Sequence, residues 1–188
     1  MEKLIERVKN ILLSPRPTWE TIKSEETDQK TIIREYLLYL VAIPVVASFI
    51  GRVIVGLPVV GYRVPFFSGL ISAIVTYVLY FVGIYIAALI VNALAPTFGG
   101  TKNDLAAFKV VAYSYTAPLV AGIFGLIPAL SPLAILGLYG IYLLYLGLPA
   151  LMECPQEKAL PYTVVIVIVG LVIVVIISGI SGLMLVSH

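Results

Sequence analysis

Five apolar runs of about 20 residues or more constrain this chain more than any other feature of its sequence. A helix that crosses the hydrocarbon core of a bilayer needs about 20 mostly apolar residues. The chain of 188 residues is 61% hydrophobic and 12% charged, with a mean hydropathy of +1.07, whereas soluble domains are about 25% charged. We therefore predict an all-α integral membrane protein, a bundle of five transmembrane helices at about residues 32–57, 66–94, 105–127, 132–151 and 161–186.

Short stretches rich in Gly, Pro or charged residues separate these runs, and they read GLPVVGYRVP, APTFGGTKND, IPALSP and ECPQEKALP in chain order. Asn103 or Asp104 can cap the third helix, and Pro161 suits the first turn of the fifth. IPALSP is the weakest separator, so the third and fourth segments could instead form one hairpin that does not fully cross. The predicted organisation is a head over residues 1–30 and a transmembrane domain over 31–188.

The distribution of lysine and arginine predicts the orientation of the chain. With five spans, the N-terminus shares a side with the second-to-third and fourth-to-fifth loops. Ten of the 12 Lys and Arg residues lie on that side, and only Arg52 and Arg63 lie on the other. Because cytoplasmic loops carry an excess of positive charge, we expect a multi-pass cell-membrane protein with a cytoplasmic N-terminus and an outer C-terminus.

The charged head predicts an amphipathic helix followed by an anchor. In MEKLIERVKNILL the apolar residues recur at helical spacing, with charged residues on the opposite face. Such a helix is expected to lie flat on the cytoplasmic surface of the membrane. Trp19, the only tryptophan, would sit at headgroup depth as an interfacial anchor. The alternative is that the head is a docking surface for a cytoplasmic protein.

Lys109 is the charged residue of the third run, in the segment KVVAYSYTAP. It lies about 8 Å from the start of its helix, so its ammonium group can extend to the cytoplasmic interface. Pairing with Glu153, Glu157 or Asp104 on the same side is compatible with this placement. A role in binding a substrate or a proton is the alternative, because polar groups inside a membrane are costly.

Two polar residues share the helix face of Lys109. Tyr113 and Thr116 follow it at four and seven residues, whereas Tyr115 points to another face. This polar face is expected to meet a neighbouring helix or a cavity. Interhelical hydrogen bonds average about 0.6 kcal/mol, so specific packing is sufficient to explain the residues.

Prolines and one asparagine mark further positions within the runs. Pro118 cannot donate a backbone hydrogen bond, so it predicts a kink that frees the carbonyl of Ser114. Pro44 predicts a second kink, in the first helix. Asn92, near the inner end of the second helix, is expected to bond a neighbour. Two kinked helices could leave a cavity between them.

Several kinds of chemistry lack the residues that they need. Cys154 is the only cysteine and His188 the only histidine, so one chain offers neither a disulfide nor a multi-ligand Cys/His metal site. The sequence contains no Ser-His-Asp set, phosphate-binding loop or dinucleotide motif. We therefore expect no enzyme activity, no cofactor and no metal. The balanced charges of the head also lack the basic stripe of a nucleic-acid binder.

Three segments carry a family resemblance: LLSPRPTWETIKSEE before the first run, the central VVAYSYTAPLV, and YLGLPALMECP before the last run. In order and spacing they resemble the Yip-one domain family, the Ypt/Rab-interacting membrane proteins, in its short prokaryotic form. The resemblance implies five spans with a cytoplasmic N-terminus, and it makes Tyr113, Tyr115 and Pro118 counterparts of the family's Gly-Tyr…Pro segment. Eukaryotic relatives act in vesicle trafficking, contact Rab-type GTPases and self-associate. Their long head carries an Asp-Leu-Tyr-Gly-Pro motif that this head lacks.

Two functional hypotheses follow. The first is a non-enzymatic scaffold of Yip type, membrane-organising or trafficking-like, whose partners are the lipid bilayer, a second copy of the chain and a cytoplasmic protein. It rests on the head, on the resemblance and on small residues four apart, such as Gly69 with Ala73 and Gly83 with Ala87. The alternative is a small transporter or channel for an ion or small solute, with a polar site around Lys109.

Overall fold

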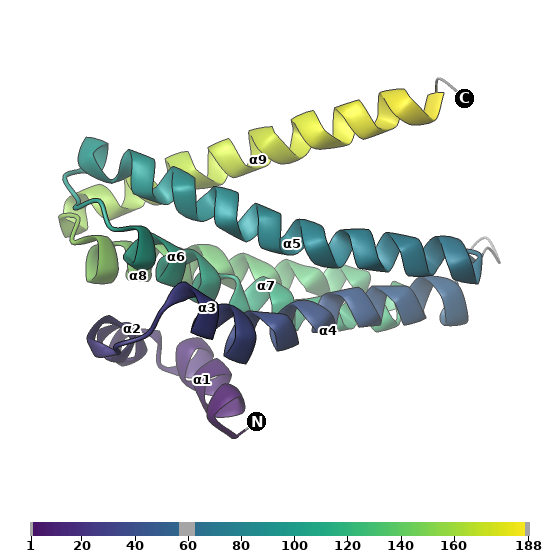
Figure 1. Cartoon of the computed structure of the whole chain (residues 1–188), viewed down its shortest axis with the longest axis horizontal. Coiled ribbons are helices and arrows are strands. Elements are labelled where there is room, and N and C mark those ends of the chain that lie inside the picture. The colour runs from purple at the N-terminus through teal and green to yellow at the C-terminus, as the bar shows by residue number, and fades with distance from the viewer. Residues whose placement is uncertain (1, 57–62, 187–188) are drawn as a thin grey trace.

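The computed structural model describes residues 2–56 and 63–186, with side chains as far as Leu171, and every regular element in these ranges is a helix (Figure 1). Leu57 and His188 lie outside the described residues. In chain order the elements are α1 Glu2–Leu13, α2 Pro15–Ser24, α3 Gln29–Ile32, η1 Ile33–Leu37, α4 Leu38–Phe49, η2 Ile50–Val55, α5 Phe66–Leu94, η3 Ala95–Phe98, α6 Asp104–Ser114, α7 Thr116–Ala121, η4 Gly122–Leu126, η5 Pro128–Leu138, α8 Tyr139–Met152 and α9 Gln156–Val186. The all-helical prediction is confirmed for these residues.

Four of the five predicted runs form helices that are long and apolar enough to cross a membrane. They are Gln29–Val55, Phe66–Phe98, Asp104–Leu126 and Pro128–Met152. The fifth run lies within α9, one helix of 31 residues. That α9 crosses the membrane stays a prediction, as does the orientation of the chain.

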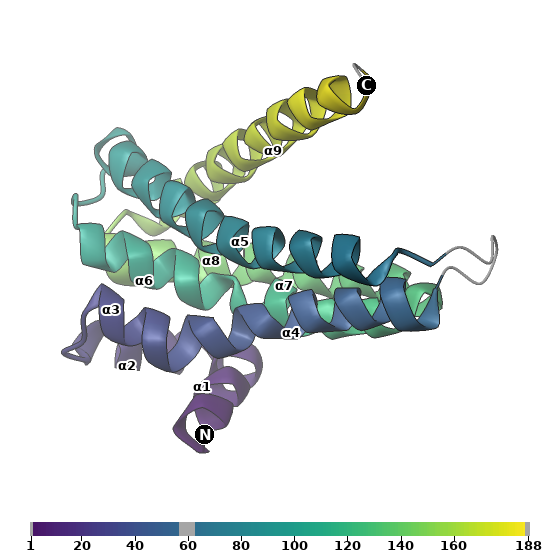
Figure 2. The same ribbon diagram turned by 45° about the vertical axis from the view of Figure 1, so that its right-hand side comes forward.

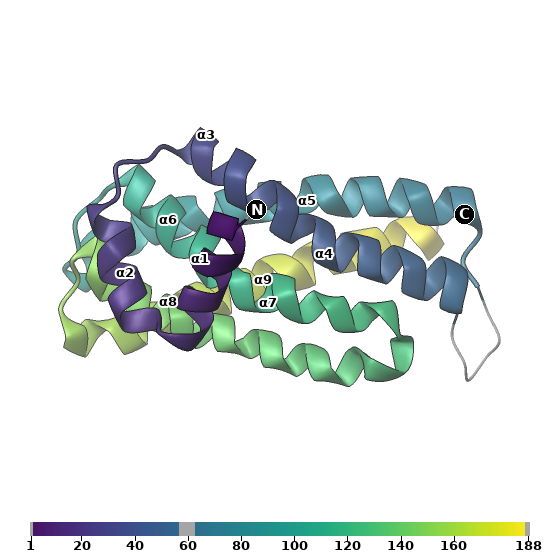
Figure 3. The same ribbon diagram turned by 90° about the horizontal axis from the view of Figure 1, so that it is seen from below.

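The long helices lie lengthwise beside one another, with the head against one half of the bundle. α4, α5, α7 and α8 run together, and α9 diverges from α5 toward its C-terminal end (Figures 1 and 2). Seen from below, α1 and α2 lie across the half of the bundle that holds α6, where α2 packs on α8 (Figure 3). The start of α5 lies at the opposite end of the bundle.

α6 is the central helix of the fold. Every residue from Ala106 to Ser114 is buried, and α5, α8 and α3 all pack against this helix. A helix that is surrounded on all sides needs no polar face. Lys109 therefore lies inside the protein, and its ammonium group needs protein partners.

The third span is interrupted near its middle. α6 ends at Ser114, and Tyr115 links it to α7, three residues before Pro118. Proline removes a backbone donor and clashes with the preceding turn, so a break here has the cause expected from the sequence. The Thr116 hydroxyl donates to the carbonyl of Tyr113 at 2.6 Å, and in this way one carbonyl next to the break gains a partner.

The junction between the third and fourth spans is shorter than the sequence indicated. Only Ile127 lies between η4 and η5, and Pro132, expected in the separator, lies inside η5. Pro128 begins η5, because a proline suits the first turn of a helix. The third and fourth segments are therefore separate helices that divide within IPALSP, at Ile127. Each of the two segments is long and apolar enough to cross by itself.

Gly140 allows α8 to approach the break between α6 and α7. A Cβ atom at this position would lie 2.8 Å from the carbonyl oxygen of Ser114 and 2.9 Å from Cδ of Pro118. Real Cβ contacts are longer, so any side chain here would push the helices apart. Gly170 on α9 differs, since a Cβ there would meet nothing within 4 Å.

Replacing Gly140 by Ala should lower the free energy of unfolding by about 1–3 kcal/mol, the usual cost of an overpacked contact. The matched variant Gly170→Ala should be neutral or slightly stabilising, because alanine favours a helix over glycine. Thermal unfolding in detergent micelles measures both. Equal losses in the two variants would show that the contact at Gly140 does not limit packing.

Candidate functional site

Lys109 lies in the middle of α6 and is only 5% exposed. Its ammonium group donates hydrogen bonds to the carbonyl oxygens of Ile22, at 2.9 Å, and Glu25, at 2.8 Å. These oxygens belong to the C-terminal end of α2, where helix carbonyls lack partners and a cation is favoured. Lys109 therefore caps a helix of the head. The sequence also allowed pairing with a carboxylate, but the hydrogen bonds of Lys109 go to these two carbonyls.

Glu25 and Arg7 connect the cap to α1. The carboxylate of Glu25 forms an ion pair with the guanidinium group of Arg7, and both side chains are partly exposed. The guanidinium carbon of Arg7 also lies 5.8 Å from the ring centroid of Tyr113, a cation–π distance. Arg7 thus contacts both the end of the head and the third span.

Trp19 is buried between the head and the transmembrane helices. It is 1% exposed, and its ring meets that of Tyr113 edge to face, with centroids 6.3 Å apart. A Cβ on Gly147 of α8 would lie 2.8 Å from the indole, so this glycine forms the seat of the ring. Trp19 packs on protein and does not present its ring to lipid. Its depth relative to the headgroups stays a prediction.

Tyr36 of the first span extends the same group of contacts. Its ring lies 4.9 Å from that of Tyr113, and its hydroxyl oxygen lies 2.7 Å from Oγ1 of Thr116. Because the Thr116 hydroxyl donates to the Tyr113 carbonyl, Tyr36 is the donor to Thr116. We call this whole set the head-docking cluster: Arg7, Trp19, Glu25, Tyr36, Lys109, Tyr113 and Thr116.

Two further contacts hold the head on α8. The Tyr139 hydroxyl donates to the carbonyl of Leu12 at 3.0 Å, at the end of α1. Each head helix therefore has a terminal carbonyl bonded by a transmembrane side chain. Lys23 and Glu153 form an ion pair at 3.5 Å, but both are about half exposed, so this pair contributes little.

The structure does not bring all the predicted site residues together. Asn92 accepts a hydrogen bond from the backbone of Asn103 at 2.8 Å and donates to Asp104, so it joins the end of α5 to the start of α6. Tyr115 is half-buried at the α6–α7 break, and Pro118 packs near Gly140. These three residues lie at contacts between elements of the bundle.

Asp28 shows how the chain leaves the head. Its carboxylate accepts a hydrogen bond from the backbone N–H of Thr31 at 2.8 Å and caps α3. Hydrogen bonding from Thr31, first by its side chain and then by its backbone N–H, holds the pKa of Asp28 below its usual range. The first span therefore begins at a fixed point directly after the last contact of the head.

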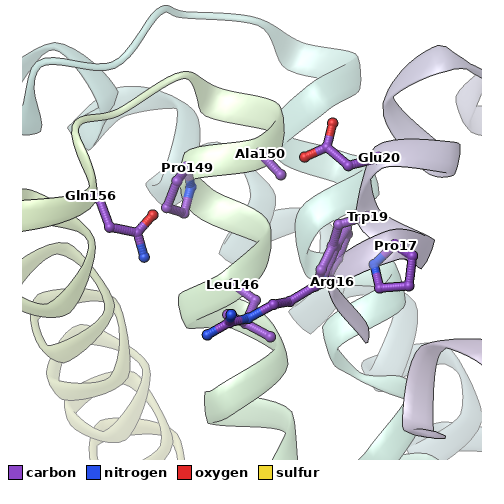
Figure 4. A pocket seen from close by; sticks show the side chains of 8 residues that line it. All are labelled: Arg16, Pro17, Trp19, Glu20, Leu146, Pro149, Ala150 and Gln156. Carbon is purple, nitrogen blue, oxygen red and sulfur yellow. The ribbon is translucent and has the colours of Figure 1, made fainter. Parts of the chain in front are cut away.

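Two cavities lie beside the head-docking cluster. One, of about 520 Å³, is lined by both acidic and basic groups, including Lys23, Glu26 and Lys109. The other, of about 530 Å³, lies between α2, α8 and the start of α9, and Arg16 and Glu20 both line it (Figure 4). Each cavity is lined by both acidic and basic side chains. This mixture is typical of an exposed protein surface, whereas a binding site for an ion would carry charges of one sign. Within the described residues, no group of three His, Cys, Asp or Glu side chains could hold a metal.

Several cluster members could not be identified from the sequence. Arg7 and Glu25 are two of many charges in the head, and Tyr36 is one of 12 tyrosines. No residue near Gly147 in the sequence indicates that an aromatic ring packs against this glycine. The sequence marked only Trp19, as the single tryptophan, and the face shared by Lys109, Tyr113 and Thr116.

Replacing Lys109 by Met should loosen the head, because two carbonyls of α2 lose a charged donor. Hydrogen bonds to charged groups contribute about 1.5–3 kcal/mol. Limited trypsin digestion of the reconstituted protein should then cleave after Lys23 faster than in the parent. Lys102→Met, at an exposed position, is the control. An unchanged rate of cleavage in the Lys109 variant would contradict the capping role.

Replacing Gly147 by Val should expel Trp19 from its seat, since the new side chain would overlap the indole. The emission of this single tryptophan should move to longer wavelength, and acrylamide should quench it more strongly. Gly170→Val, where the new Cβ meets nothing within 4 Å, controls for a β-branched residue in a helix. Unchanged emission in Gly147→Val would place Trp19 elsewhere.

A family model matches most of the chain. The model described as the Yip1 domain matches residues 9–177, which include α2, all four apolar spans and the first part of α9. No curated protein and no solved structure matches the chain. The extent of the family match shows that the chain belongs to the Yip1 domain family, as the three sequence segments indicated.

Proposed function

We propose that this member of the Yip1 domain family is a non-enzymatic multi-pass membrane protein that self-associates and acts as a scaffold, with its head as the docking surface for a cytoplasmic protein. The observation that carries the proposal is an unfilled helix face at Gly83. A Cβ at Gly83 would meet nothing within 4 Å, and Ala87 lies one turn further along α5. Small residues four apart allow two transmembrane helices to approach closely.

The other small-residue pair of α5 has a different use. A Cβ at Gly69 would overlap the side chain of Val53 and lie 3.4 Å from the ring of Phe49. That face is therefore filled from within the chain, by α4 and η2. The face at Gly83 remains for a second copy, and the exposed side chains of Val82 and Ile86 beside it would be covered on association.

The docked head supports the second half of the proposal. Its buried side chains, Ile11, Trp19 and Ile22, fix α1 and α2 on the bundle, and its charged residues other than Arg7 and Glu25 are exposed. A partner would meet a fixed surface and would not have to order a free segment, which lowers the entropic cost of binding. Lys109 and Tyr113 are engaged in these contacts, which favours a structural role for them over a solute site.

Replacing Gly83 by Leu should weaken self-association roughly tenfold, which corresponds to about 1.4 kcal/mol. A bulky side chain keeps two backbones apart where a glycine lets them meet. Crosslinking in native membranes over a range of expression levels measures the effect. Gly170→Leu is the control, because Gly170 is also open but has isoleucine and valine four residues away. A strictly monomeric parent protein would refute the proposal.

A further inference from the structure

A cleft between the first two spans lies at the end of the bundle away from the head. It has a volume of about 270 Å³ and lies between α4 with η2 on one side and α5 on the other. Its polar lining comes from five side chains, Ser48, Arg52, Ser72, Thr76 and Tyr80. None of them belongs to the head-docking cluster.

The lining residues form two stripes on facing helices. Pro44, Ser48 and Arg52 follow one another at intervals of four, which places them on one face. Ser72, Thr76 and Tyr80 repeat the interval on α5. The sequence therefore directs polar side chains from both helices into the same space, at a depth where lipid would favour apolar ones.

The four hydroxyl groups have unused hydrogen-bonding capacity. Among the described residues, no hydrogen bond involves the side-chain oxygens of Ser48, Ser72, Thr76 or Tyr80, whereas the adjacent Tyr77 donates to the carbonyl of Leu38 at 2.9 Å. Thr76 lies about 15 Å along the axis of α5, near half the thickness of the hydrocarbon core. A hydroxyl without a partner there costs free energy, so the cleft favours water or a polar ligand over an acyl chain.

The charge of the cleft selects the kind of ligand. Among the described residues that line the cleft, Arg52 is the one charged residue, and none is a carboxylate. In a cleft with low-dielectric walls, a single sign of charge concentrates ions of the opposite sign. Hydroxyl and guanidinium groups are also the donors that bind phosphate oxygens.

We propose that this cleft admits water and binds an anionic phosphate group, either that of a lipid headgroup or free phosphate. Arg52 supplies the charge, and the hydroxyls of Ser48, Ser72 and Thr76 supply hydrogen bonds. This site does not depend on self-association or on the head.

Thiol modification in proteoliposomes tests access to the cleft. Single cysteines replace Thr76 and Ser72 in a Cys154→Ser background, with the methanethiosulfonate reagent on both sides of the membrane. Only a hydrated thiol ionises and reacts. The native Cys154 is 4% exposed, and burial raises the pKa of its thiol, so this cysteine reacts slowly with the reagent. The Cys154→Ser background removes the slow reaction that remains. We expect the two cleft cysteines to react roughly tenfold faster than Val75→Cys and Leu79→Cys, which lie at similar depth on the exposed surface of α5.

The sign of the reagent tests the role of Arg52. A sulfonate-bearing and a trimethylammonium-bearing reagent are each compared with their own rates toward a free thiol. The anionic reagent should be favoured roughly tenfold at Thr76→Cys, and Arg52→Gln should remove that preference. A preference that persists in the Arg52→Gln variant would overturn the proposed charge selection.

Protection of the thiol identifies the source of the phosphate. In phosphatidylcholine vesicles, inorganic phosphate should slow modification of Thr76→Cys if the ligand is free phosphate. Vesicles that contain phosphatidylglycerol should slow it without added phosphate if the ligand is a lipid. Either result supports the site, whereas protection by neither overturns it. Cleft cysteines no more reactive than the two lipid-facing controls would show that acyl chains fill the space.

Circular dichroism and monodisperse elution check that each cysteine variant is folded, and Ser72→Cys keeps the test valid if Thr76→Cys is not. These variants lie away from Gly83, so the two proposals are tested separately. A monomeric protein with a reactive, anion-selective cleft would refute self-association and would support the anion-binding cleft.

Discussion

The contact between the Lys109 ammonium group and the end of α2 is the interaction on which the arrangement of the head depends. Both the ammonium group and the carbonyls need a hydrogen-bond partner, and each provides one for the other. An ammonium group in a helix surrounded by protein must have polar partners, and the last carbonyls of α2 have none within their own helix. The contact therefore satisfies a buried charge and a helix terminus together, and it joins residues more than 80 positions apart in sequence.

The rest of the head follows from this fixed point. Trp19 can enter its seat at Gly147 only when α2 lies across α8, and the ion pair of Glu25 with Arg7 brings α1 alongside. The amphipathic pattern of α1 suits a folded protein surface as well as it suits a lipid surface. Ile11 at the end of α1 is fully buried by protein, so part of the apolar face is already covered.

The fold was more predictable from the sequence than the site. Apolar runs of spanning length specify helices because lipid leaves the backbone no other partner, and four of the runs became such helices. The helix break lies three residues before Pro118, and Lys109 and Tyr113 both contact the head. The partners of these two residues, Tyr36, Trp19 and Glu25, depend on how distant segments pack, and no local pattern contains that information. Gly140 and Gly147 could not be identified from the sequence for the same reason. Their role depends on the distant residues that pack against them.

The seat of Trp19 also imposes an order on assembly. A chain is made from its N-terminus, so the head exists before α8, which carries Gly147 and Tyr139. Until the fourth span has entered the membrane, the head has no place to dock, and its apolar side chains need another cover. During synthesis the amphipathic face of α1 can rest on the membrane surface or on a chaperone. The head can therefore dock only after the fourth span is in place. In a chain truncated before α8, the indole of Trp19 would stay exposed.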